Sequence, residues 1–282
     1  TALMSHRKRG MTQASLLDAC ETLMQTLESM GARVAHQLRV GDGRIREDTI
    51  EEALALFLDA RLIVAHDTGP EPIYTIDSER RIALEYYQNT VIHFFVPRAL
   101  IAAGLLVDKD DWVDTTRLND RVQQLSRLFK HEFIFRTDAT FDEIFADTVR
   151  DMSEDGEIEV RNGQVQASEG IKRQRLLRYF TMLQTFFESY LLALRGAEIV
   201  LDGPISKKDW YKRTLALGQQ MYLAGEIERR ESLSKLKLET ALKALEDYRL
   251  VQFNDEMLER GDGVESVADL HALEPKLTSF LR

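Results

Sequence analysis

The sequence has a single cysteine, Cys20, among 282 residues. One thiol excludes an intramolecular disulfide and a thiolate zinc cluster, and it favours a reducing, cytosolic environment. No segment matches a phosphate-binding loop, and neither G-x-G pair has the third glycine of a dinucleotide site. No serine lies in a G-x-S-x-G nucleophile elbow. The sequence therefore gives no pattern for nucleophilic catalysis or nucleotide binding, and we expect no cofactor.

Clustered metal ligands are also missing. The six histidines are scattered and show no close ligand spacing. The pair His131-Glu132 begins like a zinc-protease motif, but Phe135 stands where the second histidine would be. We expect no metal site.

Excess positive charge is absent as well. The formal net charge is -10 and the pI is near 5.2, so the averaged surface field repels nucleic acid. A few local Arg or Lys side chains can still hold a small anion in an acidic protein. Apolar residues make up 44% of the chain, which predicts a folded protein of two or three compact units.

No uninterrupted apolar run is long enough to cross a bilayer. Residues 90–107 approach that length, but His93, Pro97 and Arg98 lie near the centre. A guanidinium at mid-span costs roughly 2.5 kcal/mol or more, so we expect no transmembrane helix. Pro97 is expected to kink one helix, or to end it and begin the next. Residues 176–194 carry an apolar stripe that suits either a core-facing helix or a helix lying on anionic lipid.

Helix and strand signals recur in one order. Apolar spacing predicts a helix over residues 13–30, with Thr12 as N-cap and Gly31 as stop. A helix over 48–60 and strands at 62–64 and 73–76 follow, which is the order of a winged-helix unit. The same order returns with a helix at 140–153 and strands at 157–160 and 165–167, joined by the hairpin turn Asn162-Gly163.

A third, weaker copy consists of a helix at 238–247 and a strand at 249–253. The junctions at 59–62, 155–158 and 247–250 align without gaps, which indicates a helix-hairpin unit used three times. Their spacings, 155 − 59 = 96 and 247 − 155 = 92, do not fit a solenoid, and three chance junctions are the alternative. Long helical regions are expected at 78–107 and 169–200.

These signals predict a mainly α fold with small β-hairpins, a helical bundle with repeated winged-helix-like helix-hairpin units. We predict three domains. Residues 1–77 form a helical unit with a winged-helix-like hairpin, residues 78–168 add long helices and the second helix-hairpin unit, and residues 169–282 add long helices, a third helix-strand unit and a C-terminal tail.

A winged-helix order also raises the possibility of a transcriptional regulator, because the helix before the hairpin enters DNA in such folds. Residues 49–59 contain no basic side chain, and residues 140–154 contain only Arg150. We therefore expect no binding to nucleic acid.

Three stretches carry a family resemblance. Residues 86–97, with the sequence YYQNTVIHFFVP, resemble a segment downstream of the active site in glycerol-3-phosphate and dihydroxyacetone-phosphate acyltransferases. Residues 1–10 and 128–136 agree in order and spacing, so the resemblance spans residues 1 to about 252. It implies the C-terminal region of a bacterial membrane-associated glycerol-3-phosphate acyltransferase.

In that family a His-x-x-x-x-Asp motif transfers an acyl group from acyl-CoA or acyl carrier protein to the sn-1 hydroxyl of glycerol 3-phosphate, the first step of phospholipid synthesis. The motif precedes the region matched here. The positions five residues after the six histidines hold Met11, Gly41, Glu71, Arg98, Arg136 and Lys276. We therefore expect no catalytic residue in this chain, which should be inactive alone.

The resemblance also implies partners and a location. Since the chain begins at Thr1 with no charged-then-apolar leader, we expect an upstream acyltransferase domain in the same protein, which binds the acyl donor and glycerol 3-phosphate. A peripheral location on the cytoplasmic face of the membrane is expected. The alternative is a stand-alone, non-catalytic scaffold or regulatory protein of lipid synthesis.

The matching motif residues are expected to be structural or to form an interface: Tyr86, Tyr87, Asn89, His93, Lys130, Glu132 and Arg136. At helical spacing Tyr86, Asn89 and His93 share a face, which suits a hydrogen-bonded brace against the catalytic domain. A buried polar network and a direct substrate contact are the alternatives. A contact with phosphate or the membrane surface, or else a solvated turn, is expected for Arg7, Lys8 and Arg9.

Overall fold

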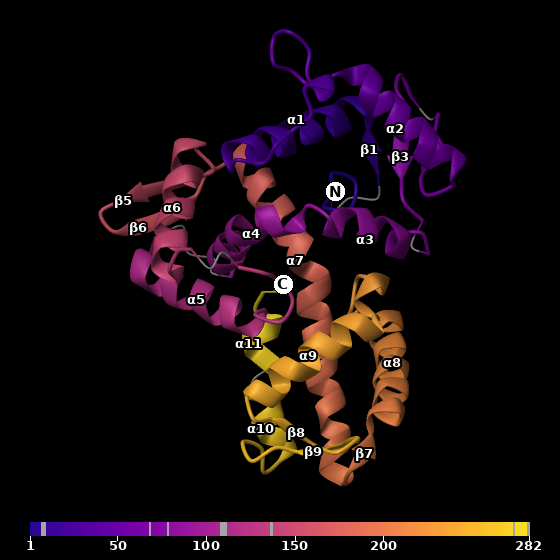
Figure 1. Cartoon of the computed structure of the whole chain (residues 1–282), viewed down its shortest axis with the longest axis vertical. Helices are drawn as coiled ribbons and strands as arrows, with labels where there is room; N and C mark the ends of the chain where they lie inside the picture. Colours follow the sequence, from indigo (N-terminus) through magenta and orange to yellow (C-terminus); the bar gives the residue numbers. More distant parts are fainter. Residues whose placement is uncertain are drawn as a thin grey trace. The chain divides into compact units, whose positions relative to one another are not determined.

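The computed structural model describes residues 1–6, 10–67, 69–77, 79–107, 112–135, 138–272 and 274–280. The chain divides into two compact units, Thr1–Val96 and Pro97–Arg282. Helices dominate both units, and the β-structure consists of small three-stranded antiparallel sheets (Figure 1). The predicted mainly α fold with small hairpins is confirmed. The division at residues 77/78 and 168/169 stays a prediction, although each predicted range contains one sheet.

The sheets belong to a repeat in which a short strand, two helices and a hairpin follow one another. In each sheet the last strand lies between the other two, in the orders β1-β3-β2, β4-β6-β5 and β7-β9-β8. The first repeat consists of β1 (Met11–Thr12), α1 (Gln13–Ser29), α2 (Glu47–Asp59), β2 (Val64–His66) and β3 (Ile73–Thr75). The second consists of β4 (Val113–Asp114), α5 (Thr115–Leu128), α6 (Phe141–Glu154), β5 (Ile158–Arg161) and β6 (Gln164–Ala167). The third consists of β7 (Ile205–Ser206), α8 (Lys207–Leu223), α9 (Lys235–Asp247), β8 (Val251–Asn254) and β9 (Met257–Arg260).

Each repeat begins with a buried apolar residue followed by a helix N-cap. The buried residues are Met11, Val113 and Ile205. The N-cap side chains of Thr12, Asp114 and Ser206 accept hydrogen bonds from backbone N–H groups of the next helical turn. The apolar side chain ties the two-residue strand to the core, and the polar one satisfies free donors at the start of the helix. This pair of residues fixes where each repeat begins.

The second helix of each repeat ends in the same left-handed turn. Arg61, Gly156 and Arg249 have positive φ angles of 53°, 65° and 57°. The next residue donates its N–H to a carbonyl five residues earlier, as in Leu62 to Phe57. The gapless alignment of the junctions is therefore wrong by one residue, because Arg61 matches Gly156 and not Glu157. In the first repeat, the turn also moves β2 to 64–66 from the expected 62–64.

The other described elements connect or flank the repeats: α3 (Arg81–Asn89), α4 (Ile92–Leu106), α7 (Ile171–Gly196), α10 (Val267–His271), α11 (Glu274–Thr278) and the 3-10 turns η1 (His36–Leu38), η2 (Ala197–Asp202) and η3 (Arg230–Ser232). The break in the first long helical region falls at Thr90 and Val91, before α4. Pro97 lies inside α4 and does not begin a new helix. The expectation of a helix boundary at Pro97 is thus wrong.

In the unit Pro97–Arg282, α7 is the central helix, with α8, α9 and α11 packed along it (Figure 1). Its apolar stripe is buried, with exposed fractions of 0% for Leu183 and Phe187 and 4% for Leu191. The stripe faces the core, and the lipid-facing alternative is wrong. No single described helix is long and apolar enough to cross a membrane, and only the sharply bent pair α3 and α4, taken together, meets those criteria.

Candidate functional site: two motif clusters

The first motif cluster lies on α3 and the start of α4, within the unit Thr1–Val96. Leu84 and Gln88, both 6% exposed, anchor α3 on its buried side. Tyr86 is 74% exposed on the opposite side, and Asn89 and His93 are also exposed. The family motif therefore forms a surface, which we call the α3 face: Ile82, Tyr86, Asn89, Thr90 and His93.

Ring packing and one hydrogen bond, from the Thr90 hydroxyl to the Tyr87 carbonyl at 2.7 Å, hold the α3 face in place. The ring of Tyr87 lies 5.7 Å from Phe57 of α2 and 5.8 Å from Tyr86, measured between centroids. The His93 ring lies 4.1 Å from Phe94. Among the described residues, the side chains of Tyr86, Asn89 and His93 have no hydrogen-bond partner. Because they are exposed, the alternative of a buried polar network is wrong, and the predicted common helix is interrupted before His93.

The second motif cluster follows α5 and contacts the third repeat. The Lys130 Nζ lies 2.7 Å from an Oδ of Asp247, at the end of α9, and the His131 Nε2 lies 2.6 Å from the same atom. Glu132 accepts a hydrogen bond from the hydroxyl of Thr240, also on α9. Three successive motif residues thus bind one helix. We call these residues the α9 clamp.

Aromatic side chains next to the α9 clamp pack against α7 and hold it in place. Phe129 is fully buried, and its ring centroid lies 5.0 Å from those of Phe187 and Tyr190 on α7. Phe133 lies 4.9 Å from Phe186. Such edge-to-face pairs add stability beyond the area they bury. Two buried phenylalanines, Phe129 and Phe133, therefore flank the three polar residues that contact α9.

These contacts shift the pKa values of two groups, Asp247 and Tyr190. The hydrogen bond from Lys130, supported by His131, holds the pKa of Asp247 below its usual range. Burial raises the pKa of the Tyr190 phenol, and the nearby Glu132 carboxylate raises it further. Asp247 is therefore a carboxylate and Tyr190 a neutral phenol near pH 7. Neither group is set up to exchange a proton at that pH.

Glu157 and Glu188 are buried carboxylates that lie outside the motifs. The Arg98 guanidinium contacts Glu157 and Asp155, each at 2.8 Å, and Tyr179 donates to Glu157 at 2.7 Å. Glu188 on α7 accepts from the Ser232 hydroxyl at 2.6 Å. Burial raises the pKa of Glu157 and of Glu188.

Both carboxylates have structural roles. Arg98 joins α4 to the second hairpin, and Glu188 fastens the η3 segment to α7. Sequence reasoning weighed Arg98 only as an obstacle to membrane insertion and missed its partners, although a guanidinium in an apolar run needs a carboxylate nearby. Glu188 was missed because its partners outside α7, the Ser232 hydroxyl and the backbone N–H groups of Glu228 and Arg229, lie 40 or more residues away in the sequence.

The part of the chain that the structure describes has no group of three or more His, Cys, Asp or Glu side chains able to hold a metal ion. Four of the expected site residues lie outside the described residues: Arg7, Lys8, Arg9 and Arg136. The α3 face and the α9 clamp are surfaces for contact and packing. Neither arrangement contains an acid, base and nucleophile in mutual contact.

Comparison with known proteins decides the family. The model of the glycerol-3-phosphate acyltransferase C-terminal region matches residues 1–254. The chain belongs to this family. The resemblance noted in the sequence is thereby confirmed, and the match covers all three repeats except the end of the last hairpin.

Two curated relatives are much longer than the region they share with this chain. The putative acyltransferases plsB1 of Mycobacterium bovis and Mycobacterium tuberculosis are each 23% identical over 239 residues, which is 79% of this chain. The match spans only 38% of the length of each relative. Most of each relative therefore has no counterpart in the sequence described here.

Proposed function

We propose that this chain is the non-catalytic C-terminal region of a glycerol-3-phosphate acyltransferase and binds the acyltransferase domain of the same protein through the α3 face. The observation that carries the proposal is the exposure of Tyr86, Asn89 and His93, whose side chains have no hydrogen-bond partner among the described residues. The matched family is a C-terminal region, and the curated relatives extend well beyond it, which supports a partner on the same polypeptide.

The α3 face has the composition of a protein interface. Ile82 is 55% exposed and Tyr86 is 74% exposed, four residues apart on α3. Exposed apolar side chains grouped with polar ones mark interaction surfaces, and tyrosine is enriched among the residues that dominate binding. Asn89 and His93 add donors and acceptors at one end.

The chemistry in this proposal belongs to the upstream domain. That domain would transfer an acyl group from acyl-CoA or acyl carrier protein to the sn-1 hydroxyl of glycerol 3-phosphate, at the start of phospholipid synthesis. This chain contributes no His-x-x-x-x-Asp motif. A peripheral position on the cytoplasmic face of the membrane is part of the proposal. The buried α7 stripe makes no contribution to lipid contact, which leaves the predicted contact at Arg7, Lys8 and Arg9.

The test is association of this chain with the acyltransferase domain, expressed as a separate polypeptide. We expect Tyr86→Ala to weaken binding by about tenfold or more, as for a central interface tyrosine. The matched control is Leu223→Ala, which removes a 76% exposed side chain from α8. It should leave the dissociation constant unchanged.

Acyltransferase assays separate the alternatives. The isolated chain should give no turnover with acyl-CoA and glycerol 3-phosphate, and turnover above the blank would contradict a non-catalytic role. If the chain does not bind the acyltransferase domain at all, the proposal fails and a stand-alone scaffold becomes the better explanation.

A further inference from the structure

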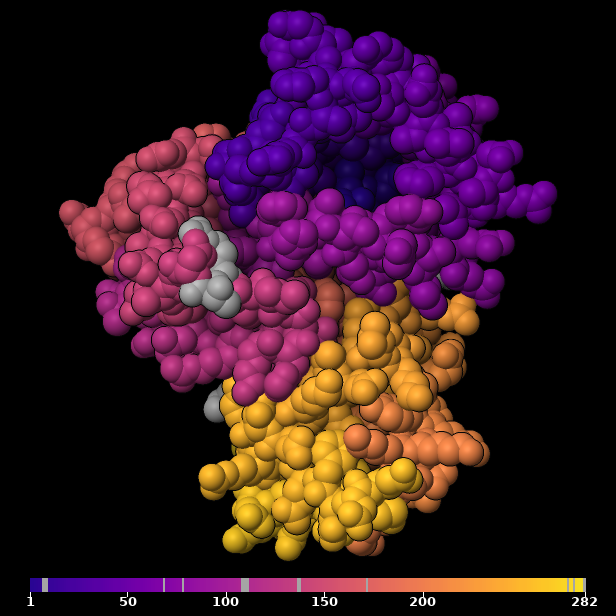
Figure 2. Space-filling model, in the orientation of Figure 1, coloured from indigo at the N-terminus to yellow at the C-terminus, as the bar shows by residue number. Residues whose placement is uncertain are grey.

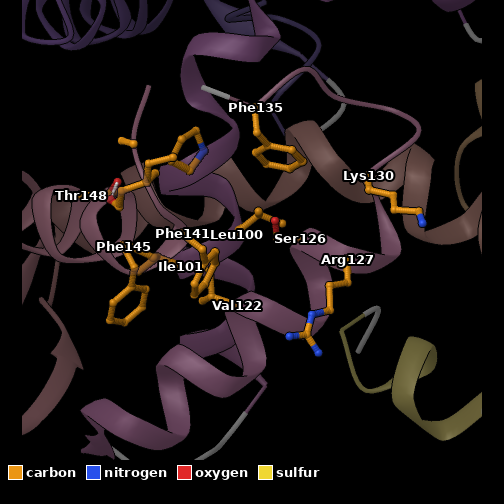
Figure 3. Close-up of a pocket in the computed structure, with 13 residues that line it drawn as sticks. Leu100, Ile101, Val122, Ser126, Arg127, Lys130, Phe135, Phe141, Phe145 and Thr148 are labelled. Carbon is orange, nitrogen blue, oxygen red and sulfur yellow. Dashed lines mark hydrogen bonds between the residues drawn. The ribbon is translucent and has the colours of Figure 1, made fainter. Parts of the chain in front are cut away.

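A cavity of about 230 Å³ lies between α4 and the helices α5 and α6 of the second repeat. Most of its wall is aliphatic or aromatic, including Leu100, Ile101, Val122, Phe135, Phe141 and Phe145. Figure 3 shows Arg127 and Lys130 at the right of the cavity and Phe145 and Thr148 at the left. The cavity therefore has an apolar interior and a cationic end.

One residue that lines the cavity can be compared across the three repeats. The residue twelve positions after the N-cap is Met24 in the first repeat (24 − 12), Ser126 in the second (126 − 114) and Gly218 in the third (218 − 206). Met24 is buried, and Gly218 is covered by Leu192 and Leu233, which a Cβ there would meet at 2.6 Å and 2.4 Å. Ser126 instead lines the cavity. The small serine leaves room that no other side chain fills.

The cationic end distinguishes this cavity from another in the first repeat. The first-repeat cavity, of about 180 Å³, has no Lys or Arg among the described residues that line it. In the second repeat, Lys130 is paired with Asp247, but Arg127 is exposed and has no ion pair or hydrogen bond with any described residue. A guanidinium in this state is suited to bidentate binding of a phosphate or carboxylate.

We propose that the second repeat binds a lipid with one acyl chain and a phosphate head. Part of the chain occupies the cavity near Ile101 and Phe141, and the phosphate lies against Arg127 with Lys130 beside it. The volume lies below the roughly 300 Å³ of ordinary ligand pockets, which suits part of a single acyl chain. An empty apolar cavity forfeits packing contacts, so a chain there stabilises the fold.

The acyl chain and the anionic charge are inferred from the cavity alone. The choice of phosphate over carboxylate rests on the proposed function, because acylation of glycerol 3-phosphate yields a lipid of this kind. The binding test below uses this chain without the acyltransferase domain. Its failure is therefore distinguishable from a failure of the α3 face to bind that domain.

The test is calorimetric titration of the chain with 1-oleoylglycerol 3-phosphate below its micelle concentration. We expect saturable binding of one lipid per chain. Arg127→Gln should weaken binding by about tenfold or more, the usual effect of losing a charge-assisted contact. Ser126→Met, which places the side chain of Met24 at the equivalent position, should weaken it by filling the cavity. Arg213→Gln, an exposed arginine of α8, is the matched control and should bind like the unaltered chain.

Two further ligands distinguish the contribution of the phosphate head from that of the acyl chain. The uncharged 1-oleoylglycerol should bind more weakly and should not respond to Arg127→Gln, and glycerol 3-phosphate should not bind measurably. Absence of saturable lipid binding would overturn the proposal. If Ser126→Met bound the lipid as tightly as the unaltered chain, the acyl chain would not occupy the cavity. If Arg127→Gln bound it as tightly as the unaltered chain, the phosphate would not contact Arg127. Either result overturns the proposal as stated.

Discussion

Asp247 is a single side chain on which two motif residues converge. Lys130 and His131 both lie within 3 Å of one of its oxygens, at 2.7 Å and 2.6 Å. Its side chain is 39% exposed, so water screens the pair and limits its contribution to stability. The cluster serves mainly to fix where the end of α9 lies against the residues after α5.

The pH dependence of this contact has a definite sign. Since the folded-state pKa of Asp247 is lowered, its contribution is present above the unfolded pKa of about 3.9 and is lost as pH falls through the folded value. Asp247→Asn should lower the free energy of unfolding at pH 7 by about 0.5 kcal/mol, the size typical of an exposed ion pair. Urea unfolding should show this difference shrinking below about pH 3.9.

The matched control for Asp247 is Asp59, the last residue of α2. Asp59 has no ion pair with a described residue, so Asp59→Asn should not change stability at pH 7. A difference between Asp247→Asn and the unaltered chain that is the same at pH 7 and pH 3 would contradict an ionic role.

Helices and turns show which elements can be predicted from sequence. The helix after Thr12, the Asn162-Gly163 turn and the second hairpin were predicted because capping residues, left-handed turn residues and apolar spacing act within a few positions. The two-residue strands β1, β4 and β7 were missed because two residues have no periodicity. The signal that could have found them is an apolar residue followed by Ser, Thr or Asp before a helix.

A left-handed residue ends the second helix of each repeat, and two of the three are arginines. Arg249→Gly should raise the free energy of unfolding by about 1 kcal/mol, because glycine adopts a positive φ without the steric penalty of a Cβ. The control is Arg213→Gly, inside α8, which should lower stability by about 1 kcal/mol. Thermal unfolding of both variants measures the contrast. A loss of stability in Arg249→Gly would show that its side chain makes a contact outweighing the strain.

For the whole molecule, sequence reasoning identified the motif residues but not their surroundings. Spacing placed Tyr86 and Asn89 on one side of a helix, but it could not show that this side is uncovered, because exposure depends on distant segments. In the same way, Lys130 and Glu132 were selected by resemblance, whereas their partners on α9 lie 117 and 108 residues away (247 − 130 and 240 − 132). Contacts between residues so far apart in the sequence can be identified only from the folded structure.

Replacing His93 tests whether the α3 face is an interface or part of the reaction site in the complete acyltransferase. His93→Ala should weaken association of the two parts by about fivefold, as for a peripheral interface residue, and should leave the pH dependence of kcat unchanged. His36→Ala, an exposed histidine of η1, is the control. A shifted pH profile in His93→Ala alone would instead place His93 at the reaction.

Because each sheet is built from strands of one repeat, the sheets also bear on the order in which the chain folds during synthesis. Every sheet is completed by strands from its own repeat, ending at residues 75, 167 and 260. Each repeat can thus finish its sheet as soon as its last strand leaves the ribosome, without waiting for later sequence. The α9 clamp is the exception, since Lys130, His131 and Glu132 have no partners on α9 until residues 240–247 have been translated. This contact between the second and third repeats therefore forms only after α9 has been translated.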